Sequence, residues 1–215
     1  MIRSSSLCRV TRTTVLLGLG LAAAPASAHG QAAGRPSAQE PAYPGRYPFT
    51  EADVHFVTGM ISHHAQAIVM AGWAPTHDAS DAIRRLCERI INAQADEITL
   101  MQAWLRDRNQ PVPEAKPMPV KMTMHGMEHE MMMPGMLTDG QVQQLDQARG
   151  GEFDRLFLTF MIQHHRGAVT MVEQLFSSPG AGQDEAVFKF TSDIYADQTT
   201  EIERMQKMLL TLPQR

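Results

Sequence analysis

The chain carries one pattern twice, and this internal repeat constrains its fold more than any other feature of the sequence. Residues 53–71 and 154–172 align with a shift of 101 positions, and both contain M-I-x-H-H-x-x-A-x-x-M. A second segment, Q-x-x-E-I-x-x-M-Q, begins at Gln94 and returns at Gln198, where the shift is 104. Two copies of one structural unit are expected to pack together, because a single copy cannot bury its apolar face alone.

The first copy has the periodicity of two helices joined by a short connection. Thr50 and Asp53 form a capping pattern, and apolar residues then recur at helical spacing to about Gly72. Ser80 can cap a second helix, which we expect to run to about Arg108.

The second copy repeats this arrangement after a short additional helix. Thr138 and Gln141 form another capping pattern, and the helix that they open is expected to break at Gly150-Gly151. A long helix then runs to about Ser177, and a last helix ends near Leu210.

The segment between the copies is different in kind. Residues 109–136 contain five prolines, which exclude a continuous helix, and no stretch of the chain alternates convincingly as a strand. The predicted fold is therefore all-α, a four-helix bundle of two repeated helical hairpins. Its predicted parts within a domain at 49–211 are a hairpin at 49–108, a Met-rich linker at 109–137 and a hairpin at 138–211.

The N-terminus has the order of a secretory signal peptide. Arg3, Arg9 and Arg12 give a positive start, and a short apolar run and the small residues A-S-A follow. We predict a signal peptide at 1–28 and a flexible lead-in, rich in Pro, Ala and Gly, at 29–48. The mature protein would be secreted or periplasmic, with no integral membrane segment after cleavage.

Composition then narrows the choice of partner. Loss of the signal would move the formal net charge from −4 to −7, and an acidic surface argues against nucleic acid. Cys8 would leave with the signal, so that Cys87 has no intrachain disulfide partner. The full sequence has sixteen methionines against two cysteines, and thioether is a soft metal ligand that forms no disulfides in an oxidising compartment.

Helical geometry places ligand-type side chains on the inner faces of the predicted bundle. Burial of four imidazoles and two carboxylates costs several kcal/mol without partners. A bound metal is one such partner, and a closed hydrogen-bond network of His with Glu and Gln across helices is the other. The metal-ligand candidates in the bundle are Met60, His63, His64, Met70, Glu97, Met101, Met161, His164, His165, Met171, Glu201 and Met205.

The linker contains a second group of candidates, in the stretch MTMHGMEHEMMMPGM at 122–136. Thioethers at M-x-M and M-x-x-M spacing, with imidazole nearby, suit Cu(I) or Ag(I), and a thioether needs no deprotonation to bind. The alternative is a low-complexity linker in which only M-P-G-M packs on the bundle. The linker candidates are Met122, Met124, His125, Met127, His129, Met131, Met132, Met133 and Met136.

The duplicated motif, D-x2-F-x3-M-I-x-HH-x2-A-x2-M followed by Q-x2-EI-x2-M, resembles a secreted bacterial family catalogued as domain of unknown function 305. The resemblance covers about residues 49–211 and implies a ferritin-like helical bundle. It also implies copper binding, because some relatives are periplasmic copper binders linked to copper resistance. The family pattern falls on Asp53, Met60, His63, His64, Met70, Gln94, Glu97 and Met101, and again on Asp154, Met161, His164, His165, Met171, Gln198, Glu201 and Met205.

Three functions fit these features. The first is an extracytoplasmic protein that captures or buffers copper, as Cu(I), with Ag, Zn and Fe as further ions and a metal-exchange protein as a compatible partner. The second is a metal-dependent oxidase with a His/Glu site at the bundle centre, although neither HH helix has the Glu-x-x-His of ferritin-like di-iron enzymes. The third is a structural or adaptor bundle with a buried His-Glu-Gln network. No catalytic nucleophile constellation or phosphate-binding glycine loop is recognisable.

Overall fold

The computed structural model describes residues 48–124 and 127–213, and for 120–124 and 127–131 it describes the backbone alone. The predicted signal peptide at 1–28, and the lead-in at 29–48 except for its last residue, lie outside the described residues. The elements within the described part are α1 (Glu51–Gly72), α2 (Asp81–Asp107), β1 (Val120–Met124), β2 (Met127–Met131), α3 (Asp139–Gln147), α4 (Gly150–Ser177) and α5 (Glu185–Thr211).

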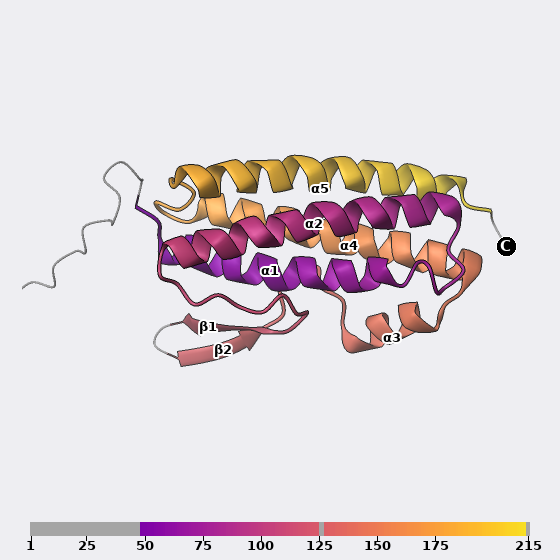
Figure 1. The fold of residues 1–215 in the computed structure, drawn as a ribbon, viewed down its shortest axis with the longest axis horizontal. Helices are drawn as coiled ribbons and strands as arrows, with labels where there is room; N and C mark the ends of the chain where they lie inside the picture. Colours follow the sequence, from indigo (N-terminus) through magenta and orange to yellow (C-terminus); the bar gives the residue numbers. More distant parts are fainter. Residues whose placement is uncertain (1–47, 125–126, 214–215) are drawn as a thin grey trace, which may run out of the picture. The chain divides into compact units, whose positions relative to one another are not determined.

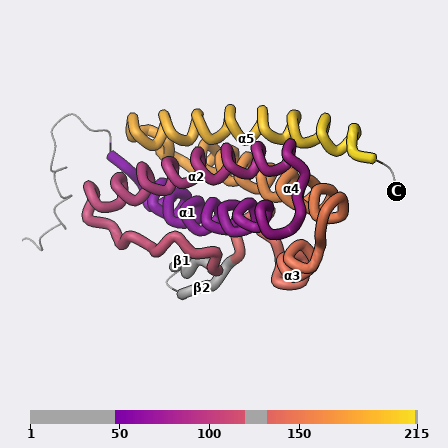
Figure 2. Tube along the Cα trace, turned by 45° about the vertical axis from the view of Figure 1, so that its right-hand side comes forward, coloured from indigo at the N-terminus to yellow at the C-terminus, as the bar shows by residue number. Residues whose placement is uncertain are grey.

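The four long helices form two hairpins, α1 with α2 and α4 with α5, which pack together through α1 and α4 (Figure 1). The ribbon of β1 and β2 lies on the α1 side of the bundle (Figure 1). The short helix α3 lies on the same side (Figures 1 and 2). The connecting segment therefore covers one face of the bundle, and α2 and α5 lie away from it.

The predicted helix starts are confirmed by their caps. Thr50 and Asp53 form a complete capping box at α1, and Thr138 and Gln141 form another at α3. The Ser80 hydroxyl accepts a hydrogen bond from the Ile83 amide and opens α2. Each cap satisfies backbone N–H groups that the first turn of a helix cannot pair internally.

The predicted break between α3 and α4 is present but lies slightly earlier than expected. Helix α3 ends at Gln147, and α4 already begins at Gly150, whose φ of 57° is left-handed. The Gly150 amide donates to the His77 carbonyl at 2.8 Å, and His77 Nε2 lies 2.8 Å from the Asp146 carbonyl. His77, on the α1–α2 connection, thus ties this break to the first hairpin.

The linker also contains two strands, where no strand was expected. Strands β1 and β2 pair antiparallel, with Met122 opposite His129 and Met124 opposite Met127. Apolar and polar residues do alternate in V-K-M-T-M and M-E-H-E-M, but five residues are too few to distinguish a strand from irregular linker. Within the described residues, the fold is thus all-α apart from this ribbon.

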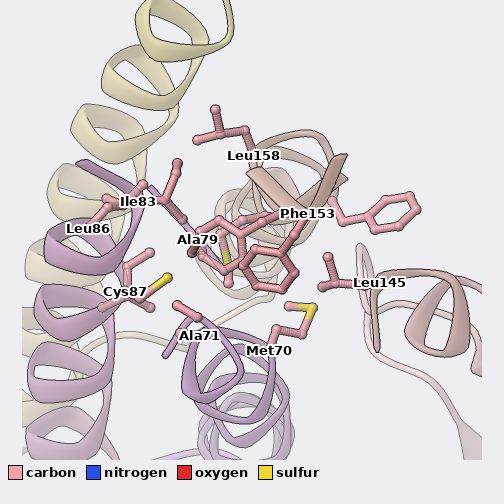
Figure 3. Packing of buried hydrophobic residues seen from close by; sticks show 14 of the residues in the cluster. Met70, Ala71, Ala79, Ile83, Leu86, Cys87, Leu145, Phe153 and Leu158 are labelled. Atoms are coloured by element: carbon pink, nitrogen blue, oxygen red, sulfur yellow. The ribbon is translucent and has the colours of Figure 1, made fainter. Parts of the chain in front are cut away.

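Two apolar clusters fill the bundle, and the repeat relates one to the other. Buried residues of α1 up to Ile61 belong to the first cluster, and those from Ala67 onward belong to the second. Figure 3 shows part of the second cluster, where Leu145 of α3 faces Met70 and Phe153. Equivalent residues that are divided between the clusters are Phe56 and Phe157, Met60 and Met161, Ile61 and Ile162, and Met101 and Met205.

Two equivalent aspartates join the hairpins. Asp53 Oδ1 accepts from the Gly182 amide in the α4–α5 connection at 2.7 Å. Asp154 Oδ1 accepts from the Ser80 amide in the α1–α2 connection at 3.1 Å. The aspartates of the repeated motif therefore hold each hairpin to the loop of the other.

Candidate metal centre

A layer of four histidines crosses the bundle between the two apolar clusters. His63 and His64 come from α1 and His164 and His165 from α4, and each is 0% exposed. The rings of His63 and His164 lie with centroids 3.7 Å apart and planes tilted by 38°. Consecutive helical residues point about 100° apart, so one histidine of each pair faces the opposite hairpin while the other turns towards its own partner helix.

The second histidine of each pair meets a glutamate of the partner helix. His165 Nε2 donates to Glu201 Oε2 at 2.7 Å. His64 Nε2 and Glu97 Oε2 are also 2.7 Å apart, but they are not aligned as a hydrogen bond. The glutamate side chains are 14% and 18% exposed, so each pair reaches from the buried layer towards solvent between α2 and α5.

The first histidine of each pair has fewer partners. His63 Nε2 donates to the Pro134 carbonyl at 3.0 Å, and His63 Nδ1 has no hydrogen-bond partner among the described residues. Within that same part of the chain, neither ring nitrogen of His164 has a partner. Imidazole nitrogens without protein partners are available as ligands.

The polar layer is not a closed hydrogen-bond network. Gln94 is buried, and both its amide oxygen and its amide nitrogen are unpaired among the residues described. Three further atoms have no hydrogen-bond partner among the described residues: His64 Nδ1, His165 Nδ1 and Gln198 Oε1. An unsatisfied buried polar group costs about 1–3 kcal/mol, so this layer is expensive unless something binds to it.

Burial controls the protonation of His63 and His164. Desolvation lowers the pKa of His63 well below its usual 6.5, and the neighbouring His64 lowers it further. Desolvation lowers the pKa of His164 in the same way, and the repulsion between His164 and His63 when both are protonated lowers it further. Both rings are therefore neutral at pH 7, which is the form that binds metal.

We expect the metal-free protein to lose stability as pH falls below 6.5. Since the pKa values of His63 and His164 are lowered by folding, the unfolded chain binds protons that the folded chain excludes, which favours unfolding in acid. Urea midpoints measured at several pH values, with a chelator present, would show this slope. A His164→Asn variant should have a shallower slope, and an unchanged slope would contradict the neutral assignment.

Thioethers flank the histidine layer on both sides. Met60 and Met101 lie in the first cluster together with Met171 of the other hairpin. Their equivalents in the second cluster are Met161, Met205 and Met70. Each half of the bundle thus combines one His–Glu pair with buried thioethers from both hairpins.

The linker candidates differ in where they lie. Met133 and Met136 are buried in the first cluster, whereas Met132 is 45% exposed. His125 lies outside the described residues. The ribbon residues, for which the backbone is described, are Met122, Met124, Met127, His129 and Met131.

Side chains of the classical hard and borderline ligand types do not form a ready-made site. Within the described residues, no three His, Cys, Asp or Glu side chains are grouped so that they could hold a metal ion. Burial raises the pKa of the Cys87 thiol to about 12, so it stays protonated and is not a thiolate ligand. A metal in the bundle would need thioether ligands beside the imidazoles.

A known family matches most of the length of the chain. DUF305, a domain of unknown function, matches residues 53–209. The chain belongs to the DUF305 family. Among curated proteins, none matches this DUF305 protein significantly.

Solved structures of relatives share the fold. A DUF305 fragment from Deinococcus radiodurans is 29% identical, with a TM-score of 0.62, and the match covers 75% of this chain and 97% of that chain. A DUF305 protein from Streptomyces coelicolor, described as a candidate secreted protein, is 28% identical with a TM-score of 0.60, covering 74% and 92%. CopM in a Cu(II)-bound form is 30% identical with a TM-score of 0.57, covering 74% and 95%. CopM is also known in Cu(I)-bound and Ag-bound forms.

Sequence reasoning missed the residue that holds the linker over the histidine layer. Gln66 accepts from the Leu137 amide at 2.7 Å and donates to the Leu137 carbonyl at 3.1 Å. This clamp fixes the segment 133–137, which we call the strap, against α1 and α4. The sequence did contain a sign of this role: the two copies differ at this position, where Gln66 of the first copy corresponds to Gly167 of the second.

Proposed function

We propose that this DUF305 protein captures copper, as Cu(I), outside the cytoplasm, with Ag(I) as an alternative ion. The observation that carries the proposal is the buried histidine layer with its unpaired nitrogens, which lies about one helical turn from the buried Met60 and Met161 on the same helices. Imidazole and thioether are the neutral ligands that suit soft monovalent ions. Support also comes from the likeness to CopM, which is known with copper and silver bound.

The proposed bundle ligands form two equivalent sets. The first consists of Met60, His64, Glu97 and Met101 with Met171, and the second of Met161, His165, Glu201 and Met205 with Met70. His63 and His164 lie between the sets and could serve either. The polar layer between two packed hairpins also supports assignment of the bundle to the ferritin-like class.

The ribbon is proposed as a second, looser capture site. Pairs of possible soft ligands alternate along the ribbon with other pairs. Met122 lies opposite His129 and Met124 opposite Met127, whereas Lys121 lies opposite Glu130. Soft ions accept few ligands in loose geometry, so a two-stranded ribbon with several thioethers is sufficient. Such a site could exchange metal with a partner protein.

Location outside the cytoplasm rests on the predicted signal peptide at 1–28. The description of the Streptomyces coelicolor relative as a candidate secreted protein supports it. None of the helices in the described part of the chain has the length and apolarity to cross a membrane.

We expect replacement of Met60 and Met101 by leucine to weaken Cu(I) binding at the first set at least tenfold, measured in a His165→Ala background that disables the second set. Leucine removes the thioether but keeps volume and apolarity, so the cost in stability should stay below about 1.5 kcal/mol for each site. Anaerobic competition with a chromophoric Cu(I) chelator measures the affinity, and urea unfolding measures the stability.

Met208→Leu is the matched control, because Met208 is a partly buried methionine that packs beside the second cluster outside the proposed sets. It should bind Cu(I) as the unmodified protein does. Ribbon variants with Met122 and Met124 replaced by leucine should remove a separate binding step. Failure of the unmodified protein to compete for Cu(I) or Ag(I) would reject copper capture.

A further inference from the structure

The two halves of the bundle differ in charge at equivalent positions of α2 and α5. The shift of 104 that aligns Glu97 with Glu201 also aligns Arg89 with Asp193. One half therefore has a guanidinium where the other has a carboxylate. Since both positions lie two helical turns before the glutamates, this difference bears on the His–Glu pairs.

Arg89 acts on the second half. Its Nη2 lies 3.7 Å from Glu201 Oε1, while Glu201 Oε2 accepts from His165. Both oxygens of this carboxylate are thus engaged. A cation that approached Glu201 would meet the Arg89 charge and would compete with two existing partners.

The first half has the opposite environment. Among the described residues, Glu97 has no ion pair with Lys or Arg. Burial, and next the charges of Glu97, Glu201 and Asp193, raise the pKa of Asp197, which shows that these carboxylates lie within electrostatic reach. Asp193 pairs with Lys189 at 2.6 Å in an exposed ion pair, so this position brings no net positive charge towards Glu97.

Unpaired polar atoms show the same asymmetry. His64 and Glu97 touch without an aligned hydrogen bond, and Gln94, one turn away, has both amide atoms unpaired among the described residues. In the second half, His165 and Glu201 are hydrogen-bonded to each other. The first half therefore has more ligand atoms free to bind.

We propose that Arg89 makes the two halves unequal, so that the first metal ion binds at the His64–Glu97 half and the His165–Glu201 half fills later. This inference rests on the proposed function. A unit charge a few ångströms from a ligand oxygen, partly exposed to solvent, should change a monovalent cation's affinity by roughly three- to tenfold.

The test isolates each half and then changes Arg89. A His64→Ala protein retains the second half, and a His165→Ala protein retains the first. In the His64→Ala protein, Arg89→Asp should tighten Cu(I) binding by roughly three- to tenfold, measured by anaerobic chelator competition. In the His165→Ala protein, the same change should alter the affinity less than about twofold.

Arg106→Asp is the matched control, because it makes the same charge change in α2 in the last turn, away from the His–Glu pairs. Arg106→Asp should change the Cu(I) affinity equally in the His64→Ala and His165→Ala proteins. Asp193→Arg gives the converse variant and should weaken Cu(I) binding in the His165→Ala protein. Urea unfolding of every variant confirms that the comparison is between folded proteins.

Each outcome decides one question. Equal responses to Arg89→Asp in both backgrounds, or no response, would overturn the inequality while leaving copper capture intact. Equal responses are also the expected result if one ion bridges both halves. Loss of Cu(I) binding in the protein that carries neither histidine change would instead overturn the proposed function itself.

Discussion

Replacement of Asp184 by alanine is expected to cost about 3–5 kcal/mol of unfolding free energy, because it leaves a buried guanidinium without its partner. Asp184 is buried, and its carboxylate accepts from Arg108 and, at 3.0 Å, from Trp104 Nε1. It also caps α5 by accepting from the Ala186 and Val187 amides at 3.1 and 3.2 Å. One side chain thus joins the end of α2 to the start of α5.

Urea unfolding followed by circular dichroism would measure this loss. Glu185→Ala is the control, since Glu185 is exposed in the same turn and should cost less than about 1 kcal/mol through the helix dipole alone. Asp184→Asn should fall between the two, because it keeps the cap but removes the charge opposite Arg108. A loss for Asp184→Ala no larger than that of Glu185→Ala would contradict the described network.

Gly167→Ala is expected to destabilise the protein by about 3 kcal/mol through overpacking against the strap. A Cβ atom at Gly167 would lie 1.9 Å from the Pro134 carbonyl oxygen and 2.6 Å from the Gly135 Cα. These are backbone atoms, and Gly135 has a φ of 76°, so the strap cannot adjust locally. It would have to lift from α4, and His63 would then lose its carbonyl acceptor.

Amide hydrogen exchange at Leu137 would report this lifting directly, because its N–H is bonded to Gln66. Gly140→Ala is the control, since nothing lies within 4 Å of the added Cβ and alanine favours the helix by up to about 1 kcal/mol. Unchanged stability and unchanged exchange in Gly167→Ala would show that the strap does not pack on α4 as described.

The helices could be predicted from the sequence because their signals are local. Capping residues such as Thr50, Ser80 and Thr138 are read within four positions of each helix start, and apolar spacing then identifies the inner face. The repeat added the pairing of the hairpins. It also predicted that the four histidines would be buried together, and His63 and His164 indeed lie ring to ring.

Contacts between distant segments could not be predicted in this way. The approach of Arg89 to Glu201 and the clamp of Gln66 on Leu137 depend on how helices and linker are placed in three dimensions. Periodicity defines a face but not the neighbour opposite it. The ribbon was missed for a related reason, because each of its strands is stabilised by pairing with the other.

The segment that joins the two hairpins occurs only once, so it cannot follow the approximate two-fold symmetry of the repeat. Two separate hairpins of identical sequence would have presented two interchangeable surfaces, but the strap crosses the α1–α4 side once. It therefore needs an amide at Gln66 and empty space at Gly167, the same position in the two copies. Tethering has thus made the halves non-equivalent at the level of single residues, so that each copy can change without requiring the same change in the other.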